Sequence, residues 1–254
     1  MRRKLGQHFL IDEKVLDRMV QYGEVTENDV VLDVGAGRGE LTVKLAERAG
    51  KVIAVEIDRE LAEEARKRLK DYDNVEFLVG DVLKLRPSGF NKVVSNPPYN
   101  ISTKLLEWLI DENVERIVLT LQREFASKLM AKPGSTKYLY ISFLSSLFYD
   151  SNIVEFVPRT LFRPMPKVDS VIILMKRKKD VRELDEEVKK FIKFLFTRRR
   201  QGLRHILRDL VRKRGLAADL SEVFGDELLS KRIYQLTQSQ LLSIAEKFLK
   251  LKAK

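Results

Sequence analysis

Cysteine is absent from this chain of 254 residues, and histidine occurs only twice, at His8 and His205. Without cysteine the protein has no disulfides, no thiolate metal ligands and no cysteine nucleophile. Two imidazoles are too few for an ordinary protein zinc site, and they disfavour a serine-type catalytic triad. We therefore expect no metal ion.

Long hydrophobic runs are also missing. No segment approaches the roughly 18 apolar residues that a membrane span requires, and residues 1–6 lack the apolar core of a signal peptide. Apolar residues make up 44% of the sequence and charged residues 33%, which is typical of a soluble globular protein. A chain of this length can bury one substantial core and carry a small second domain. We expect a monomeric, cytoplasmic protein that contacts no membrane.

The net charge of +11 is concentrated in one part of the sequence. Residues 1–100 contain 17 Lys and Arg against 18 Asp and Glu, a net of −1, whereas residues 159–214 contain 19 basic and 7 acidic residues, a net of +12. A positive field of this density favours a polyanionic partner such as nucleic acid. Solvated helix faces are the alternative explanation. An acidic membrane surface is a weaker one, because no strongly amphipathic anchor accompanies the charge.

Short apolar segments alternate with helical patterns over the first 120 residues. Strands are predicted where Val, Ile and Leu cluster, and helices where apolar residues recur at helical spacing. This alternation, with short connections, predicts a mostly parallel sheet covered by helices on both faces, a Rossmann-like α/β fold. The predicted strands are residues 30–34, 51–57, 75–79, 92–95 and 116–121, and the predicted helices are residues 41–48, 59–70 and 104–110.

The pattern changes in the second half of the chain. Helices are predicted at residues 125–130 and 138–149, and strands at 152–157 and 168–175 would add an antiparallel edge to the sheet. From residue 185 onward the pattern is helical only. Arginines between residues 198 and 214 recur at three- to four-residue intervals, so they would share a helix face that suits RNA phosphates. We predict a main domain at residues 1–180 and a small, basic, all-helical domain at residues 181–254.

Three glycines and two carboxylates fall where predicted strands end. Gly35, Gly37 and Gly39 follow the first strand and allow a sharp turn close to a ligand, although their spacing differs from the dinucleotide-binding G-x-G-x-x-G pattern. Glu56 ends the second strand, where a carboxylate can accept both hydroxyls of a ribose. Asp81 follows the third strand, where its carboxylate could accept a hydrogen bond from the amino group of an adenine. Each carboxylate alone is typical of a solvated strand end, but together these positions predict one binding rim.

The tetrapeptide Asn96-Pro97-Pro98-Tyr99 follows the fourth strand. An exocyclic amine is a poor nucleophile, because its lone pair is delocalised into the ring. The Asn96 side-chain oxygen and the Pro97 carbonyl could both accept from such an amine and turn its lone pair toward a methyl donor, while Tyr99 offers a stacking face. The pattern predicts methylation of a nucleobase or a carboxamide. A Pro-Pro turn that closes a strand is the structural alternative.

Further motifs occur along the whole chain. Together they resemble the class I methyltransferases that use S-adenosylmethionine, and among these the ribosomal RNA adenine N6,N6-dimethyltransferase family. The matching segments are Leu5-Gly6-Gln7-His8-Phe9-Leu10, Asn96-Pro97-Pro98-Tyr99-Asn100-Ile101-Ser102, Gln122-Arg123-Glu124-Phe125-Ala126, Phe162-x-Pro164-x-Pro166-Lys167-Val168-Asp169-Ser170 and Arg199-Arg200-Gln201-Gly202-Leu203-Arg204.

The resemblance implies a catalytic domain that binds S-adenosylmethionine and a C-terminal domain that binds RNA. It implies methyl transfer to N6 of two adjacent adenosines near the 3′ end of small-subunit ribosomal RNA, within the subunit or its precursor. Cofactor contacts are expected from His8, Leu10, Gly35, Gly37, Gly39, Glu56, Asp81 and Asn96, and catalytic contacts from Asn96, Pro97, Tyr99 and Phe162.

Phe162 is predicted to form the second wall of a base pocket opposite Tyr99, because an adenine must leave its stack before its N6 can reach a sulfonium methyl. The alternative is a core phenylalanine in a proline-rich loop.

Among the predicted site residues, two depart from the family pattern. His8 stands where the family has Asn, and Pro97 stands where it has Leu. The resulting Asn-Pro-Pro-Tyr also resembles the motif of DNA adenine and protein glutamine methyltransferases. Other functions therefore stay open: a large-subunit RNA adenine methyltransferase, a protein glutamine methyltransferase, or a ribosome assembly factor without catalysis.

Overall fold

The computed structural model describes residues 8–179, 181 and 183–251, so residues 2–7, with their basic cluster and the start of the N-terminal motif, lie outside it. The chain divides into two compact units. The first comprises Met1–Ala126 and Phe148–Lys179, and the second comprises Ser127–Leu147 and Asp180–Lys254. The division between Lys179 and Asp180 lies close to residue 185, where the helical-only pattern begins. The segment Ser127–Leu147, which the sequence pattern assigns to the main domain, instead groups with the C-terminal helices.

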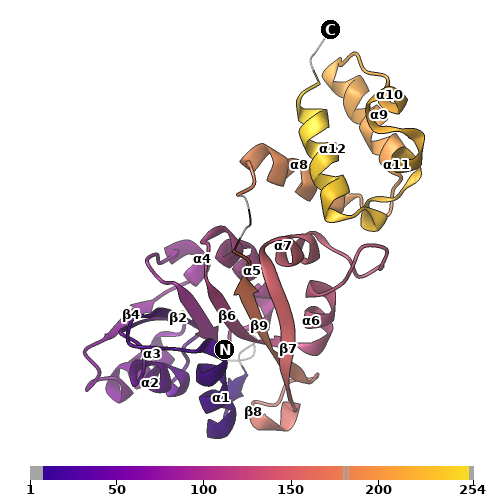
Figure 1. The fold of residues 1–254 in the computed structure, drawn as a ribbon. Helices are drawn as coiled ribbons and strands as arrows, with labels where there is room; N and C mark the ends of the chain where they lie inside the picture. Colours follow the sequence, from indigo (N-terminus) through magenta and orange to yellow (C-terminus); the bar gives the residue numbers. More distant parts are fainter. Residues whose placement is uncertain (1–7, 180, 182, 252–254) are drawn as a thin grey trace. The chain divides into compact units, whose positions relative to one another are not determined.

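A seven-stranded sheet forms the centre of the first unit (Figure 1). Its strand order is β4-β3-β2-β5-β6-β9-β7, parallel from β4 to β6, with β9 antiparallel to both β6 and β7. The predicted fold class, a mostly parallel sheet with an antiparallel edge, is thus confirmed. The strands are β2 (Val30–Val34), β3 (Lys51–Glu56), β4 (Val75–Val79), β5 (Lys92–Ser95), β6 (Arg116–Gln122), β7 (Tyr149–Val157) and β9 (Ser170–Arg177).

Amphipathic helices pack against this sheet. In α1 (Glu13–Gly23), buried side chains recur at helical spacing and pack against β5 and β6, while Asp12 caps the first turn by accepting a hydrogen bond from the Val15 amide. The strands supply the β-branched side chains of the same core, where Val31 and Val52 have no exposed surface. The other helices of this unit are α2 (Glu40–Ala46), α3 (Arg59–Arg68), α4 (Val82–Leu85), α5 (Ser102–Asp111) and the start of α6 (Arg123–Leu129).

Two short strands join segments that are distant in the sequence. β1 (Phe9–Leu10) pairs antiparallel with β8 (Phe162–Arg163), with Leu10 opposite Phe162. Both side chains belong to the hydrophobic core. This pairing holds the N-terminal segment beside the loop that follows β7.

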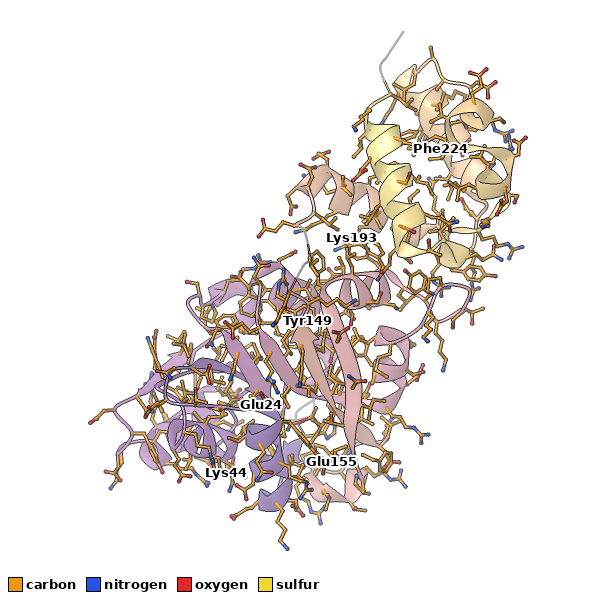
Figure 2. The ribbon with its side chains drawn as sticks, in the orientation of Figure 1. Glu24, Lys44, Tyr149, Glu155, Lys193 and Phe224 are labelled. Carbon is orange, nitrogen blue, oxygen red and sulfur yellow. The ribbon has the colours of Figure 1, made fainter. Side chains whose placement is uncertain are left out.

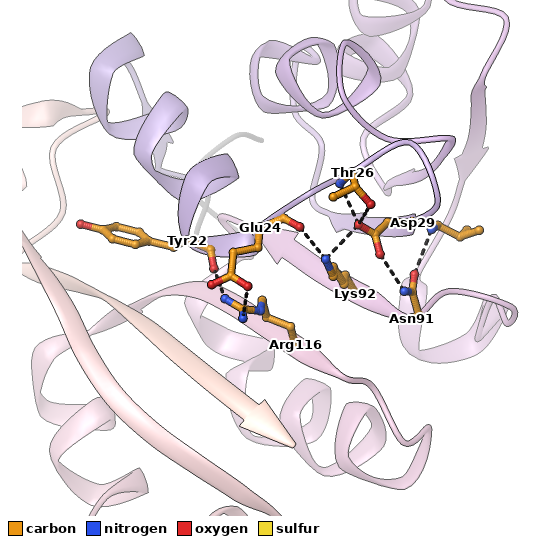
Figure 3. A network of polar contacts seen from close by, with 8 residues as sticks. Tyr22, Glu24, Thr26, Asp29, Asn91, Lys92 and Arg116 are labelled. Atoms are coloured by element: carbon orange, nitrogen blue, oxygen red, sulfur yellow. Dashed lines mark hydrogen bonds and ion pairs between the residues drawn. The ribbon is translucent and has the colours of Figure 1, made fainter. Parts of the chain in front are cut away.

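Polar side chains connect α1 to the sheet as well. Glu155 of β7, labelled in Figure 2, accepts hydrogen bonds of 2.6 and 2.8 Å from Arg18 and one of 3.1 Å from Tyr22. At the amino ends of β5 and β6, Lys92 donates to the Glu24 carbonyl, and Arg116 donates to the Tyr22 carbonyl (Figure 3). These two cations satisfy carbonyls at the C-terminal end of α1, where a helix leaves acceptors unpaired.

The second unit is helical. Its segment Ser127–Leu147 contributes aromatic side chains, and Tyr138 and Phe143 lie within 6.2 Å of Phe196, measured between ring centroids. The amide of Gly134 donates to the Tyr234 carbonyl. These contacts explain why the segment belongs to this unit. Its helices are α7 (Tyr140–Phe148), whose last residue belongs to the first unit, α8 (Glu186–Thr197), α9 (Leu203–Arg214), α10 (Leu220–Phe224), α11 (Asp226–Ser230) and α12 (Gln238–Leu249).

Candidate active site at the carboxyl ends of the strands

The glycine-rich loop turns the chain from β2 into α2. Gly35, Gly37 and Gly39 have φ angles of +73°, +60° and +85°, a region that L side chains rarely adopt. The Gly35 amide donates to the Val55 carbonyl at 2.8 Å, which ties the loop to β3. A Cβ on Gly35 would lie 2.8 Å from Cδ of Pro98, and one on Gly37 would lie 3.2 Å from the Phe9 ring. The missing side chains therefore let three segments approach one another.

Glu56 lies at the carboxyl end of β3, beside the glycine-rich loop. Its side chain is buried, and its two carboxylate oxygens accept from the amides of Gly37 at 2.9 Å and Asp58 at 2.8 Å. Burial raises the pKa of the Glu56 carboxyl above its ordinary value, against the opposing effect of these backbone donors. The same carboxylate lines two neighbouring hollows, so it can take further hydrogen bonds from a ligand.

A cavity of about 190 Å³ extends from Glu56 along the ends of β3 and β4. Asp81 lies in its wall and caps α4 by accepting from the Leu83 amide at 3.0 Å. Ile57, which is 45% exposed, lines the same cavity together with Ile101. Apolar walls with a carboxylate at one end suit a planar, amino-bearing ring such as adenine.

Asn96 follows β5 and has one amide atom without a partner. Its Nδ2 donates to the His8 carbonyl at 3.0 Å, while its Oδ1 is buried and accepts no hydrogen bond from the described residues. The donated bond fixes which side of the amide faces the hollow. His8 is itself held by a 2.7 Å hydrogen bond between its Nδ1 and the Pro164 carbonyl. An unsatisfied buried acceptor is uncommon, and it is typical of a site that a ligand completes.

Tyr99 and Pro97 line the same hollow as Asn96. The Tyr99 hydroxyl lies 2.6 Å from Oγ of Ser170, the first residue of β9, and its ring centroid lies 5.8 Å from that of His8. Burial raises the pKa of Tyr99 to about 12, against the smaller effect of the Ser170 hydrogen bond. The phenol is therefore neutral at physiological pH, and its ring has a fixed orientation.

Leu10, Gly35 and Gly37 line the hollows of the rim, whereas Gly39 and Phe162 do not. Leu10 and Gly37 line a small hollow with Asn96. Phe162 has no exposed surface and belongs to the hydrophobic core, because its pairing with Leu10 turns the ring inward. In this structure it offers no face to a base, which corrects the expectation that it forms the second pocket wall. Gly39 serves as the residue before α2 and lines none of the hollows described here.

The sequence pattern did not predict three residues that line the rim. Asp33, on β2, is fully buried and accepts from Thr42 Oγ1 at 2.8 Å, and burial raises the pKa of its carboxyl to about 7. It lines the small hollow beside Phe9. An acid inside an otherwise apolar strand was the signal that could have identified it. Phe9 and Ile57 carried no such signal, since apolar residues beside a strand usually belong to the core.

Within the described residues, no group of three or more Asp, Glu and His side chains could hold a metal ion. In the same residues, no helix is long and apolar enough to cross a membrane.

The sheet order, the glycine loop and the rim of Glu56, Asp81 and Asn96 define a Rossmann-like methyltransferase. A family model described as "Ribosomal RNA adenine dimethylase" matches residues 1–248, and the chain belongs to this family. It is 39% identical to the "Probable ribosomal RNA small subunit methyltransferase A" of Pyrococcus abyssi, over 96% of this chain and 90% of that protein.

Two solved structures are similar over the whole chain. A dimethyladenosine transferase from Plasmodium falciparum has a TM-score of 0.81 and 28% identity, covering 95% of this chain and 98% of that one. The 23S rRNA methyltransferase ErmE has a TM-score of 0.69 and 26% identity, covering 95% and 100%. The similarity therefore includes both units of the chain.

Proposed function

We propose that this protein transfers methyl groups from S-adenosylmethionine to N6 of two adjacent adenosines near the 3′ end of small-subunit ribosomal RNA. Its membership of the adenine dimethylase family and the name of its Pyrococcus abyssi relative support this substrate. The single structural observation that carries the proposal is the buried Oδ1 of Asn96 at the rim of the sheet, which accepts no hydrogen bond from the described residues.

The chain's own residues fit both ligands. Glu56 and Asp81 both line the cavity, and their carboxylates are suited to the hydroxyls of a ribose and the amino group of an adenine. S-adenosylmethionine, when bound, supplies the methyl group from its sulfonium. Asn96 Oδ1 would accept one N–H of the target amine, and the carbonyl of Pro97 would accept the other. Two acceptors of fixed position favour a pyramidal nitrogen whose lone pair is free.

No general base is required. A methylated amine in its cationic form is very acidic and loses its proton to water. Tyr99, with a pKa of about 12, stays neutral and offers its ring for stacking against the target base. The rim therefore acts by positioning its ligands and by stabilising charge.

A large-subunit substrate is the second candidate, because the ErmE structure is similar over the whole chain. The deciding experiment incubates the protein with methyl-labelled S-adenosylmethionine and, separately, with small subunits, large subunits, naked RNA, DNA or release factor. We expect label at N6 of adjacent adenosines in small subunits. Label confined to large subunits or to release factor would replace the proposed substrate, and absence of any transfer to RNA would support a non-catalytic assembly role.

Replacing Gly35 with alanine should weaken cofactor binding by at least about ten-fold. The new Cβ would meet Pro98 at 2.8 Å, and φ of +73° costs a non-glycine residue roughly 1–2 kcal/mol. Calorimetric titration with S-adenosylhomocysteine measures the loss. Gly89→Ala is the matched control, because Gly89 has φ of +82° but nothing within 4 Å of the added Cβ. If Gly35→Ala binds the cofactor product as tightly as Gly89→Ala, the close approach of Gly35 to Pro98 has no role in cofactor binding.

A further inference from the structure

Phe156 is an exposed aromatic side chain near one end of the central sheet. It lies on β7, the last strand in the sheet order, and 49% of its surface is exposed. The guanidinium of Arg123 lies over its ring, 5.8 Å from the centroid. An aromatic ring paired with an arginine in this way is a common platform for an unstacked base.

This platform adjoins the rim described above. Val157, the neighbour of Phe156, lies opposite Ser170 of β9, and Gln122, the neighbour of Arg123, lies opposite Ser170 on the other side. Ser170 is the residue that holds the Tyr99 hydroxyl. The amide of Arg123 also donates to the Asp169 carbonyl at 3.1 Å. Phe156 itself pairs with Val171, so strand alternation places its side chain on the other face of the sheet from Ser170, one residue along from the row that reaches Tyr99.

The charge around Phe156 is positive. Residues 156–168 contain Arg159, Arg163 and Lys167 and no acidic residue. The amide of Arg159 donates to the Asp169 carboxylate at 3.0 Å, which fixes the loop, and its guanidinium donates to the Lys167 carbonyl. Arg163 donates to two backbone carbonyls, of Thr160 and Phe162. The adjacent acid on β7, Glu155, is neutralised by Arg18.

We propose that Phe156 and Arg123 form a stacking subsite for an unpaired base of the RNA strand next to the target adenine. The inference rests on the proposed RNA methylation and adds a second contact to it. An adenine that enters the rim beside Tyr99 draws its flanking nucleotides across the end of the sheet, where the basic loop can hold their phosphates. Phe156, rather than the buried Phe162, presents the free aromatic face in this part of the molecule.

The test uses a synthetic RNA of the 3′-terminal region of small-subunit rRNA, with 2-aminopurine beside the target adenine. Stacking of the 2-aminopurine on Phe156 should quench the fluorescence of the 2-aminopurine. Phe156→Ala should abolish the quenching, weaken RNA binding about ten-fold and raise KM with little change in kcat. Phe156→Trp should retain the quenching and the RNA affinity of the unaltered protein. Phe156→Leu keeps the apolar bulk without a π face and should lose both. Arg123→Gln should weaken binding and reduce its salt dependence.

Ile153→Ala is the matched control, because Ile153 is 42% exposed on the same strand. It should behave as the unaltered protein. Since Phe156 is half exposed, its variants should fold normally. The fluorescence of Trp108 during unfolding checks this for the alanine and leucine variants, in which it is the single tryptophan. RNA binding by Phe156→Leu that equals that of the unaltered protein would overturn the stacking subsite. The stacking subsite would also be overturned if the Phe156 variants bound intact subunits more weakly but bound the synthetic RNA normally, because this would indicate a protein partner. In either case labelling of adenine N6 by the unaltered protein would leave the proposed function in place.

Discussion

Replacing Asn96 with alanine should lower the rate of methyl transfer by a factor of about 10²–10³ while leaving the fold intact. This is the usual cost of removing one preorganised hydrogen-bonding group from a transition state. The Oδ1 of Asn96 makes no bond in the described residues, so its loss leaves no other group unpaired. The loss of the Nδ2 bond to the His8 carbonyl should cost about 1 kcal/mol of stability. Single-turnover transfer into small subunits measures the rate.

Two further measurements separate chemistry from binding. S-adenosylhomocysteine should bind Asn96→Ala within a few-fold of the unaltered protein, because most of the expected cofactor contacts remain. Asn152→Ala removes the same side chain from an exposed position on β7 and should have no effect. A small loss of rate with a large loss of cofactor affinity would show that Asn96 holds the cofactor and does not orient the amine. If Asn96→Ala transfers no methyl group but still binds pre-ribosomal particles, an additional role in ribosome assembly would be supported.

The order of the large elements was predictable from the sequence. The predicted strands at residues 30–34, 75–79 and 92–95 coincide with β2, β4 and β5, because each is a short apolar run bounded by polar residues. The adjacency of Gly35, Glu56, Asp81 and Asn96 also followed, since the carboxyl ends of parallel strands share one edge. Their roles toward the ligands remain predictions.

The missed features depend on pairing between distant segments. β1 and β8 have two residues each, too few for any periodicity, yet their pairing determines that Phe162 is buried. The tetrapeptide predicted a stacking face at Tyr99 but not its bond to Ser170, which lies 71 residues away. Segment Ser127–Leu147 was assigned to the wrong unit, because its aromatic side chains pack on residues that follow residue 180.

Replacing Lys92 with methionine should lower the free energy of unfolding of the first unit by about 3–5 kcal/mol, because it leaves a buried carboxylate without its cation. Lys92 Nζ lies 2.8 Å from Asp29, and the two side chains are 11% and 7% exposed (Figure 3). Burial alone would raise the pKa of Asp29, but donors from Lys92, Asn91 and Thr26 outweigh it and lower that pKa to about 2. Urea unfolding followed by Trp108 fluorescence measures the change in this unit.

The pH dependence gives an independent check on the same pair. Because the folded pKa of Asp29 lies below its ordinary value of 3.8, the pair should stabilise the fold above pH 4 and lose this effect as the pH falls toward 2. Lys51→Met is the control, since Lys51 and Glu76 form a pair of 2.6 Å whose side chains are 48% and 45% exposed. Lys51→Met should lower the free energy of unfolding by less than about 1 kcal/mol. Asp29→Asn combined with Lys92→Met should recover much of the loss, because neither charge then remains buried alone. Equal costs for the buried and exposed lysines would contradict a structural role for the network that joins α1 to the amino ends of β2 and β5.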